Sequence, residues 1–134
     1  MSAREASLSL SGDPSCIAQA RHLAAAFLTK VRDRLGVPVA TASIEIVQLV
    51  VSELVTNARK YAPGPALMHL RLLGSVLRVE LWDSSPIPPA VRASDPTRIG
   101  QHGLEIVAAL AHVVTEPTAV GKRITADIAL TSVV

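Results

Sequence analysis

TASIEIVQLVVSELVTNARKY, residues 41–61, is the most informative segment of this sequence, because its apolar spacing predicts one long helix. One apolar stripe carries Ile44, Val47, Val51, Leu54 and Ala58. A second stripe, on nearly the opposite side, begins with Ile46, Leu49 and Val50 and continues into Glu53, Asn57 and Lys60. A helix that is apolar on two sides is expected to be buried on two sides. Glu53 and Asn57 would then lie where a carboxylate is costly unless it is paired, hydrated or bound to a cation.

Two elements are predicted before this helix. Residues 3–11 alternate weakly between apolar and polar side chains, which suggests an edge strand. Asp13-Pro14 has the form of a helix start, and apolar residues at helical spacing continue from there to Gly36. Gly36-Val37-Pro38 ends that helix and leads into the next.

The segment after residue 61 changes to a period of two. Residues 67–73 and 76–82 predict strands, and Gly74-Ser75 between them predicts a hairpin turn. The alternation of the second strand places Asp83 on its apolar face, at the end of the strand. Residues 84–101 contain four prolines and no regular pattern, so they predict a long loop, which in a small domain is usually functional or mobile.

The last third of the chain predicts a helix over 104–111 and a strand over 122–130. In chain order the elements favour an α+β fold. We expect a two-layer sandwich in which helices pack on one face of a mixed, mostly antiparallel sheet, with residues 1–134 as a single domain.

Composition excludes several classes of protein. Aromatic residues make up 2% of the 134 residues, namely Phe27, Tyr61 and Trp82, which argues against stacking of single-stranded nucleic acid bases. The net charge of +2 comes from scattered residues, so no patch for a phosphate backbone and no direct contact with nucleic acid are expected. The single cysteine excludes an internal disulfide framework. Without a long apolar run or a secretory leader, we expect a cytoplasmic protein that does not contact the membrane.

Three features have the residue types that nucleotide chemistry needs. Asn57 offers an amide oxygen, a hard ligand suited to Mg²⁺, and Glu53 one turn earlier could polarise a water or a substrate hydroxyl. Asp83 is a carboxylate at a strand end. The turn Gly100-Gln101-His102-Gly103-Leu104 precedes a helix, where free amide groups favour phosphate. Taken singly, each feature has a simpler explanation. An acid and an amide at this spacing often occur by chance, Asp83 could cap the following turn, and the glycine could merely start a helix.

In this order and at these distances the three features resemble the gyrase, chaperone, histidine-kinase and mismatch-repair (GHKL) ATPase superfamily. Residues 53–58 look like its N box, Asp83 like the head of its G1 box, and residues 100–104 like its G2 box. The resemblance covers roughly residues 7–130. It is greatest to the anti-sigma-factor serine kinases and the small stand-alone ATP-binding regulators of high-GC bacteria, whose fold is the Bergerat-type sandwich.

The resemblance implies a site for ATP and Mg²⁺. Glu53 would be the catalytic base, Asn57 the metal ligand, and Asp83 the acceptor of a hydrogen bond from the adenine amino group. The resemblance also places Gly100, Gly103 and Leu104 at the phosphates, and it suggests Thr125 at the adenine, two residues beyond the aligned position. Lys60 could reach a phosphate or merely lie in solvent, and His102 could touch phosphate or be a solvated loop histidine. Adenine would lie between aliphatic side chains, and Tyr61 and Trp82 are expected to brace the walls of the site.

Two hypotheses on function remain open. In the first, the protein is a serine/threonine kinase that phosphorylates a small antagonist protein and sequesters a sigma factor, with a homodimer as one arrangement. In the second, the fold is kept without catalysis, and the protein sequesters a partner. The Glu53–Asn57 pair favours the first hypothesis. The run Asp83-Ser84-Ser85-Pro86-Ile87-Pro88, which lacks the glycines of the G1 box, favours the second.

Overall fold

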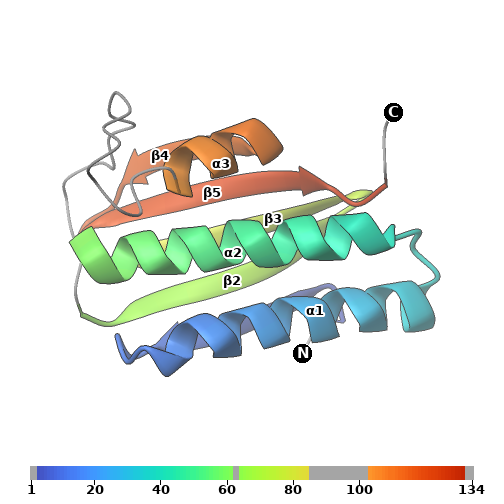
Figure 1. Cartoon of the computed structure of the whole chain (residues 1–134), viewed down its shortest axis with the longest axis horizontal. Helices are drawn as coiled ribbons and strands as arrows, with labels where there is room; N and C mark the ends of the chain where they lie inside the picture. Colours follow the sequence, from blue (N-terminus) through green and yellow to red (C-terminus); the bar gives the residue numbers. More distant parts are fainter. Residues whose placement is uncertain (1–2, 62–63, 85–102, 132–134) are drawn as a thin grey trace.

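The structure, a computed structural model, describes residues 3–61, 64–84 and 103–131 of the chain. Within these ranges the elements are β1 (Glu5–Leu10), α1 (Ser15–Leu35), α2 (Thr41–Tyr61), β2 (Ala66–Leu73), β3 (Val76–Asp83), α3 (Gly103–Leu110), β4 (His112–Pro117) and β5 (Lys122–Ala129). The strands form one sheet in the order β1-β2-β3-β5-β4, and each neighbouring pair is antiparallel. All three helices lie on one face of this sheet (Figure 1). The expected two-layer α+β sandwich is confirmed.

One strand, β4, is not among the elements predicted from the sequence. Its six residues, HVVTEP, follow α3 directly and pair with β5 at the edge of the sheet. The segment is short, and its strand-forming residues are the run Val113, Val114 and Thr115 alone. Pro117 is tolerated because it stands at the end of an edge strand, where no ladder hydrogen bond needs its nitrogen.

The start and end of α1 follow the signals in the sequence. Asp13 Oδ1 accepts a hydrogen bond of 2.9 Å from the backbone N–H of Ser15, so the carboxylate caps one of the amide groups left free at a helix start. Gly36 ends the helix with a φ of 67°, a left-handed conformation that glycine adopts without steric cost. Asp13-Pro14 and Gly36 are therefore confirmed as the boundary signals of this helix.

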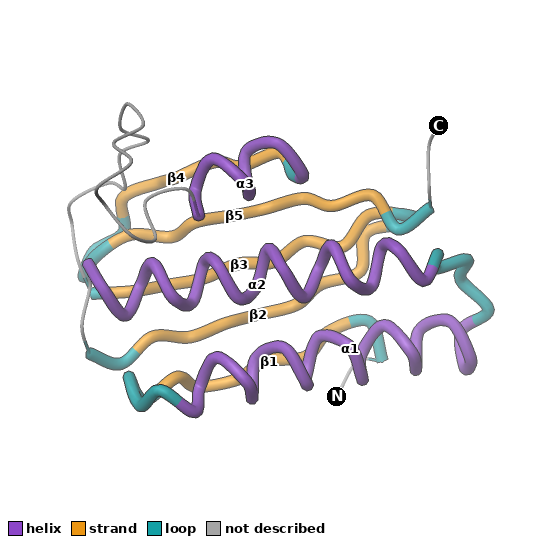
Figure 2. Tube along the Cα trace, in the orientation of Figure 1, coloured by secondary structure: helices purple, strands orange, loops and turns teal. Residues whose placement is uncertain are grey.

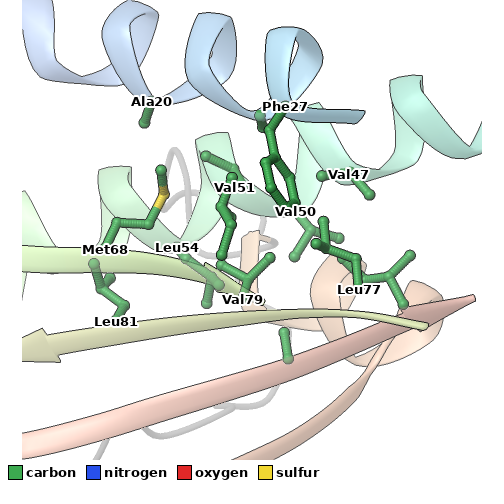
Figure 3. Close-up of a cluster of buried hydrophobic side chains, with 14 of the residues drawn as sticks. Ala20, Phe27, Val47, Val50, Val51, Leu54, Met68, Leu77, Val79 and Leu81 are labelled. Carbon is green, nitrogen blue, oxygen red and sulfur yellow. The ribbon is translucent and has the colours of Figure 1, made fainter. Parts of the chain in front are cut away.

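The core is aliphatic and lies between the helices and the sheet. Figure 3 shows Val50, Val51 and Leu54 of α2 directed toward Val79 and the neighbouring sheet residues. Of the described residues in the core, Phe27 of α1 is the one with an aromatic ring. The sheet contributes alternate side chains, since Leu77, Val79 and Leu81 are buried while their neighbours on β3 point to the other face.

The prediction that α2 is buried on two opposite sides is wrong. Its fully buried residues, Val47, Val50, Val51, Leu54 and Val55, form one continuous arc that faces the sheet. Leu49 is 40% exposed, and the edge that carries Glu53 and Asn57 is half-buried. The physical reason is the two-layer arrangement, in which α2 lies between α1 and α3 on the sheet while its outer surface faces solvent (Figure 2).

The opposite face of the sheet is covered by no helix of the described ranges, and it carries a network of charged side chains. Its centre is Glu80, whose side chain is 6% exposed and lies 3.6 Å from His69 Nδ1 and 3.6 Å from Arg123 Nη1. Trp82 belongs to this face, because its ring lies 6.3 Å from the His69 ring and 5.9 Å from the Arg123 guanidinium carbon. The expectation that Trp82 braces a site on the helix side of the sheet is therefore wrong.

The best-formed pair of this face joins neighbouring strands and makes stability depend on pH. Arg78 donates hydrogen bonds of 2.8 and 3.0 Å to the two carboxylate oxygens of Asp127 and thereby lowers the pKa of Asp127. A lowered carboxyl pKa gives stability that is present above the unfolded-state pKa and is lost as the pH falls through the folded-state pKa.

We therefore expect Asp127→Asn to lower the free energy of unfolding by about 0.5–1 kcal/mol at pH 7, the range for partly exposed pairs, and by less near pH 3. Urea unfolding at both pH values measures this. Asp33→Asn, at an exposed position of α1, is the control. An equal loss at both pH values would contradict the assignment.

Candidate functional site

Four element ends meet at one edge of the molecule. Figure 1 shows the C-terminal end of α2, the end of β3, the start of β5 and the start of α3 on the same side. The strand register agrees, since Asp83, the last residue of β3, stands opposite Lys122, the first residue of β5. The three features that the sequence analysis singled out therefore lie on elements that converge at this edge.

Glu53 and Asn57 lie on the edge of α2 that faces α3. Gln48 marks the other edge, because its side-chain amide donates a hydrogen bond of 3.4 Å to the backbone oxygen of Arg21 on α1. By helical geometry the two site residues project roughly opposite Gln48, and α3 packs against α2 on that side. Their side chains are half-buried, while Lys60, one turn further, is exposed. An acid and an amide are here partly accessible, on the edge of α2 against which α3 packs.

Asp83 is on the helix side of the sheet, as its place in the strand predicts, but it lies inside the fold. Its side chain is 1% exposed. Lys122 Nζ lies 3.0 Å from Oδ1 and 2.9 Å from Oδ2 of this carboxylate, and the Lys122 side chain is 5% exposed. An ammonium group thus spans both oxygens in a buried ion pair between β3 and β5.

Gly121, the residue before this lysine, fits a space that no side chain could enter. A Cβ at this position would lie 2.0 Å from the backbone oxygen of Asp83 and 2.8 Å from the backbone of Ser84. The backbone of β5 therefore begins in direct contact with the end of β3. This contact fixes the position from which the Lys122 side chain extends toward Asp83.

Of the remaining predicted site residues, some lie at this edge, some lie outside the described residues, and one lies on the other face of the sheet. α3 begins at Gly103 and includes Leu104, so the amide groups of its first turn stand at the converging edge. Gly100 and His102 lie outside the described residues. Thr125 pairs with Glu80 of β3 and Val114 of β4, on the face of the sheet away from the helices. The structure therefore does not bring Thr125 together with Asp83, because the two residues lie on opposite faces.

Lys122 is the site residue that the sequence analysis did not single out. A signal for it existed in the alternation of β5, where Lys122 is in phase with the buried residues Ile124, Ala126 and Ile128. A lysine in phase with a buried apolar stripe needs a buried anion, because an unpaired charge in the core is too costly. Asp83, in phase with the buried residues of β3, is that anion.

The two ends of the candidate nucleotide site fit ATP to different degrees. Asn57 and the start of α3 suit a Mg²⁺–phosphate group, since Mg²⁺ usually takes one or two protein ligands and otherwise binds phosphate oxygens and water. No cluster of three or more His, Cys, Asp or Glu side chains in the described ranges would hold a metal by itself. At the other end, a base reaches the Asp83 carboxylate only if the buried Lys122 pair opens.

A shallow hollow of about 190 Å³ lies elsewhere, between α1 and α2, and is lined by Ala18, Arg21, His22 and Gln48. Gln48 places it on the edge of α2 opposite Glu53 and Asn57. His22 lacks the acidic and proline neighbours typical of a phosphoacceptor histidine, and the hollow has no link to the converging edge. We therefore do not assign it to the site.

Comparison with known proteins finds solved structures of similar fold. No family model matches the sequence, and no curated protein matches it. Among solved structures, the chain is similar to the RsbU and RsbW domains of Rv1364c from Mycobacterium tuberculosis, with a TM-score of 0.68 at 16% identity, over 94% of this chain and 32% of that one. It also matches the Acinetobacter baumannii histidine kinase AdeS, with a TM-score of 0.49 at 13% identity, over 93% of this chain and 68% of that one.

The chain thus spans about a third of the length of the Mycobacterium tuberculosis chain in that structure. At such identity the likeness shows the fold alone, an α+β sandwich shared over 94% of this chain. In the described ranges, no helix has the length and apolar character to cross a membrane.

Proposed function

We propose that the protein is a regulator that binds ATP with Mg²⁺ at the converging edge of α2, β3, β5 and α3. The observation that carries this proposal is the half-buried Glu53–Asn57 edge of α2, which faces the helix that begins at Gly103. An accessible amide oxygen beside a helix start combines a ligand for a hard cation with amide groups that attract phosphate.

Each residue has a distinct task in this proposal. Asn57 would hold Mg²⁺ through its side-chain oxygen, and the amides of Gly103 and Leu104 would contact phosphate oxygens. Lys60, exposed near the end of α2, would reach the phosphates from solvent. Bound ATP would supply the phosphoryl group, and Mg²⁺ would neutralise part of its charge.

In its catalytic form the regulator would be a serine/threonine kinase that acts on a small antagonist protein and sequesters a sigma factor. Glu53 would accept the proton of the substrate hydroxyl. Its half-buried position supports this role, because a partly accessible carboxylate can reach the hydroxyl of a protein substrate.

The second candidate is a module of the same fold that sequesters a partner without catalysis. The buried Asp83–Lys122 pair favours this candidate, because it engages the carboxylate that would orient the base. The two candidates share the fold and differ in whether phosphate is transferred to a partner.

Calorimetry with MgATP tests the nucleotide site. We expect Asn57→Ala to weaken binding by about 10–100-fold, the usual effect of removing a polar contact to a charged group. Thr56→Ala, at the preceding position of α2, is the matched control and is expected to bind like the wild type. A folded wild-type sample that releases no heat with MgATP would rule out the proposed nucleotide site.

Transfer of labelled phosphate from ATP to candidate antagonist proteins then separates the two candidates. Glu53→Gln is expected to abolish transfer and to keep nucleotide binding, since it removes the base and retains the shape of the side chain. Binding of ATP without transfer to any tested antagonist supports the sequestering module.

A further inference from the structure

Lys122 has no role in the proposed binding of ATP, yet its ammonium group lies within hydrogen-bond distance of the Asp83 carboxylate. That carboxylate is the group that would accept a hydrogen bond from the adenine amino group. We propose that Lys122 is a latch on the base end of the site, which competes with the amino group of adenine for Asp83. This inference rests on the proposed function, because it concerns the base end of the same site. It predicts that the affinity of the chain for adenine nucleotides is set by the cost of moving Lys122.

The geometry makes the competition direct. Nζ lies 3.0 Å from Oδ1 and 2.9 Å from Oδ2, so the ammonium group engages both oxygens of Asp83. With the Asp83 side chain 1% exposed, an incoming base cannot add to the pair from solvent. The base must first displace the ammonium group.

The energetics favour the closed pair. Both an ammonium group and an exocyclic amino group donate charge-assisted hydrogen bonds to a carboxylate, but only the ammonium group adds the attraction of an opposite charge. In a buried setting the attraction between the two charges is also poorly screened. A neutral base therefore competes poorly unless Lys122 gains hydration when it leaves.

The backbone around the pair limits how the latch can open. Gly121 packs so closely against the end of β3 that a Cβ would collide with Asp83 and Ser84. The backbone of Lys122 is thereby held in register with Asp83. Opening is then a rotation of the long lysine side chain toward solvent, for which its four-carbon stem has the required freedom.

The first test follows the reactivity of the lysine amine. Wild-type protein is treated briefly with an amine-acylating reagent with and without saturating MgATP, and the modified residues are read by mass spectrometry. Lys122 is expected to react at least about tenfold more slowly than the exposed Lys30 without nucleotide, and faster when MgATP is bound. Equal reactivity of the two lysines in the free protein, or no change at Lys122 when MgATP is bound, would overturn the latch.

The second test measures affinity. Lys122→Met removes the ammonium group and keeps an unbranched side chain, so MgATP is expected to bind about tenfold more tightly than to the wild type, the difference between a charged and a neutral donor. Lys30→Met removes the same charge at an exposed position and is the control, with affinity unchanged. The double variant Asp83→Asn/Lys122→Met removes both charges and is expected to lose the gain.

The outcomes separate this inference from the proposed function. If the wild type binds MgATP and Lys122→Met binds no more tightly, the latch is overturned and the nucleotide site stands. If Lys122→Met alone binds, the latch is supported and the proposed binding of ATP by the wild type fails. If the wild type and both Lys122 variants are folded and none of them binds, the proposed nucleotide site fails and the latch fails with it. Circular dichroism of each variant establishes that it is folded.

Discussion

Replacing Lys122 by methionine is expected to lower the free energy of unfolding by about 3–5 kcal/mol, the usual cost of removing one partner from a buried ion pair. The reason is that the Asp83 carboxylate, which is 1% exposed, loses an ammonium group that contacts both of its oxygens. The loss exceeds that at exposed pairs, where water replaces the missing partner. Urea unfolding of the purified variant, followed by circular dichroism, measures this change.

A double-mutant cycle shows whether the loss comes from the ion pair. Asp83→Asn/Lys122→Met leaves no buried charge at the pair and is expected to recover most of the stability lost in Lys122→Met, because a neutral replacement of similar volume avoids the desolvation penalty. Lys30→Met should unfold like the wild type. If the effects of Asp83→Asn and Lys122→Met simply add, the two side chains are not coupled and the pair is not as described.

Gly121→Ala is expected to destabilise the fold by about 3 kcal/mol or more, at or above the upper end of the range for overpacking. The added Cβ would lie 2.0 Å from the Asp83 oxygen and 2.8 Å from Ser84, and both neighbours are backbone atoms. Backbone cannot rotate aside as a flexible side chain can, so the ends of β3 and β5 must separate. Urea unfolding measures the change.

The control for this prediction is Gly74→Ala in the β2–β3 turn. There an added Cβ meets no atom within 4 Å, and the φ of 61° accounts for the strain, about 1–2 kcal/mol. Comparable losses at the two positions would show that Gly121 is not confined between β3 and β5. A larger loss at Gly121 supports the close approach that also holds Lys122 in register.

Local signals in the sequence predicted most of the fold. The helix boundaries at Asp13-Pro14 and Gly36 and the hairpin at residues 74–75 depend on nearby residues, and the structure agrees with them. The burial of α2 depends on what lies around it. Periodicity alone could not distinguish a helix enclosed on two sides from one that lies on a sheet between two other helices.

For the site too, the spacing of nearby residues predicts some features, whereas others depend on the pairing of distant strands. The spacing of Glu53 and Asn57 fixes their common edge of α2, and the alternation of β3 fixes the face on which Asp83 lies. The partner of Asp83 depends on the register between β3 and β5, which are 39 residues apart at this pair. The same register places Thr125 on the far face, whereas the resemblance alone could assign it only by its distance from a glycine.

Ionic strength should act differently on the two faces of the sheet. On the face without helices, Arg123–Glu116 and Arg71–Glu5 join side chains that are about one-third to one-half exposed, so dissolved ions reach them. The screening length of roughly 10 Å at 0.1 M salt shrinks to roughly 3 Å at 1 M, which weakens such pairs. Asp83–Lys122, enclosed on the helix side, is largely protected from this screening. Concentrated salt would therefore loosen the charged face while the junction of β3 and β5 keeps its strength.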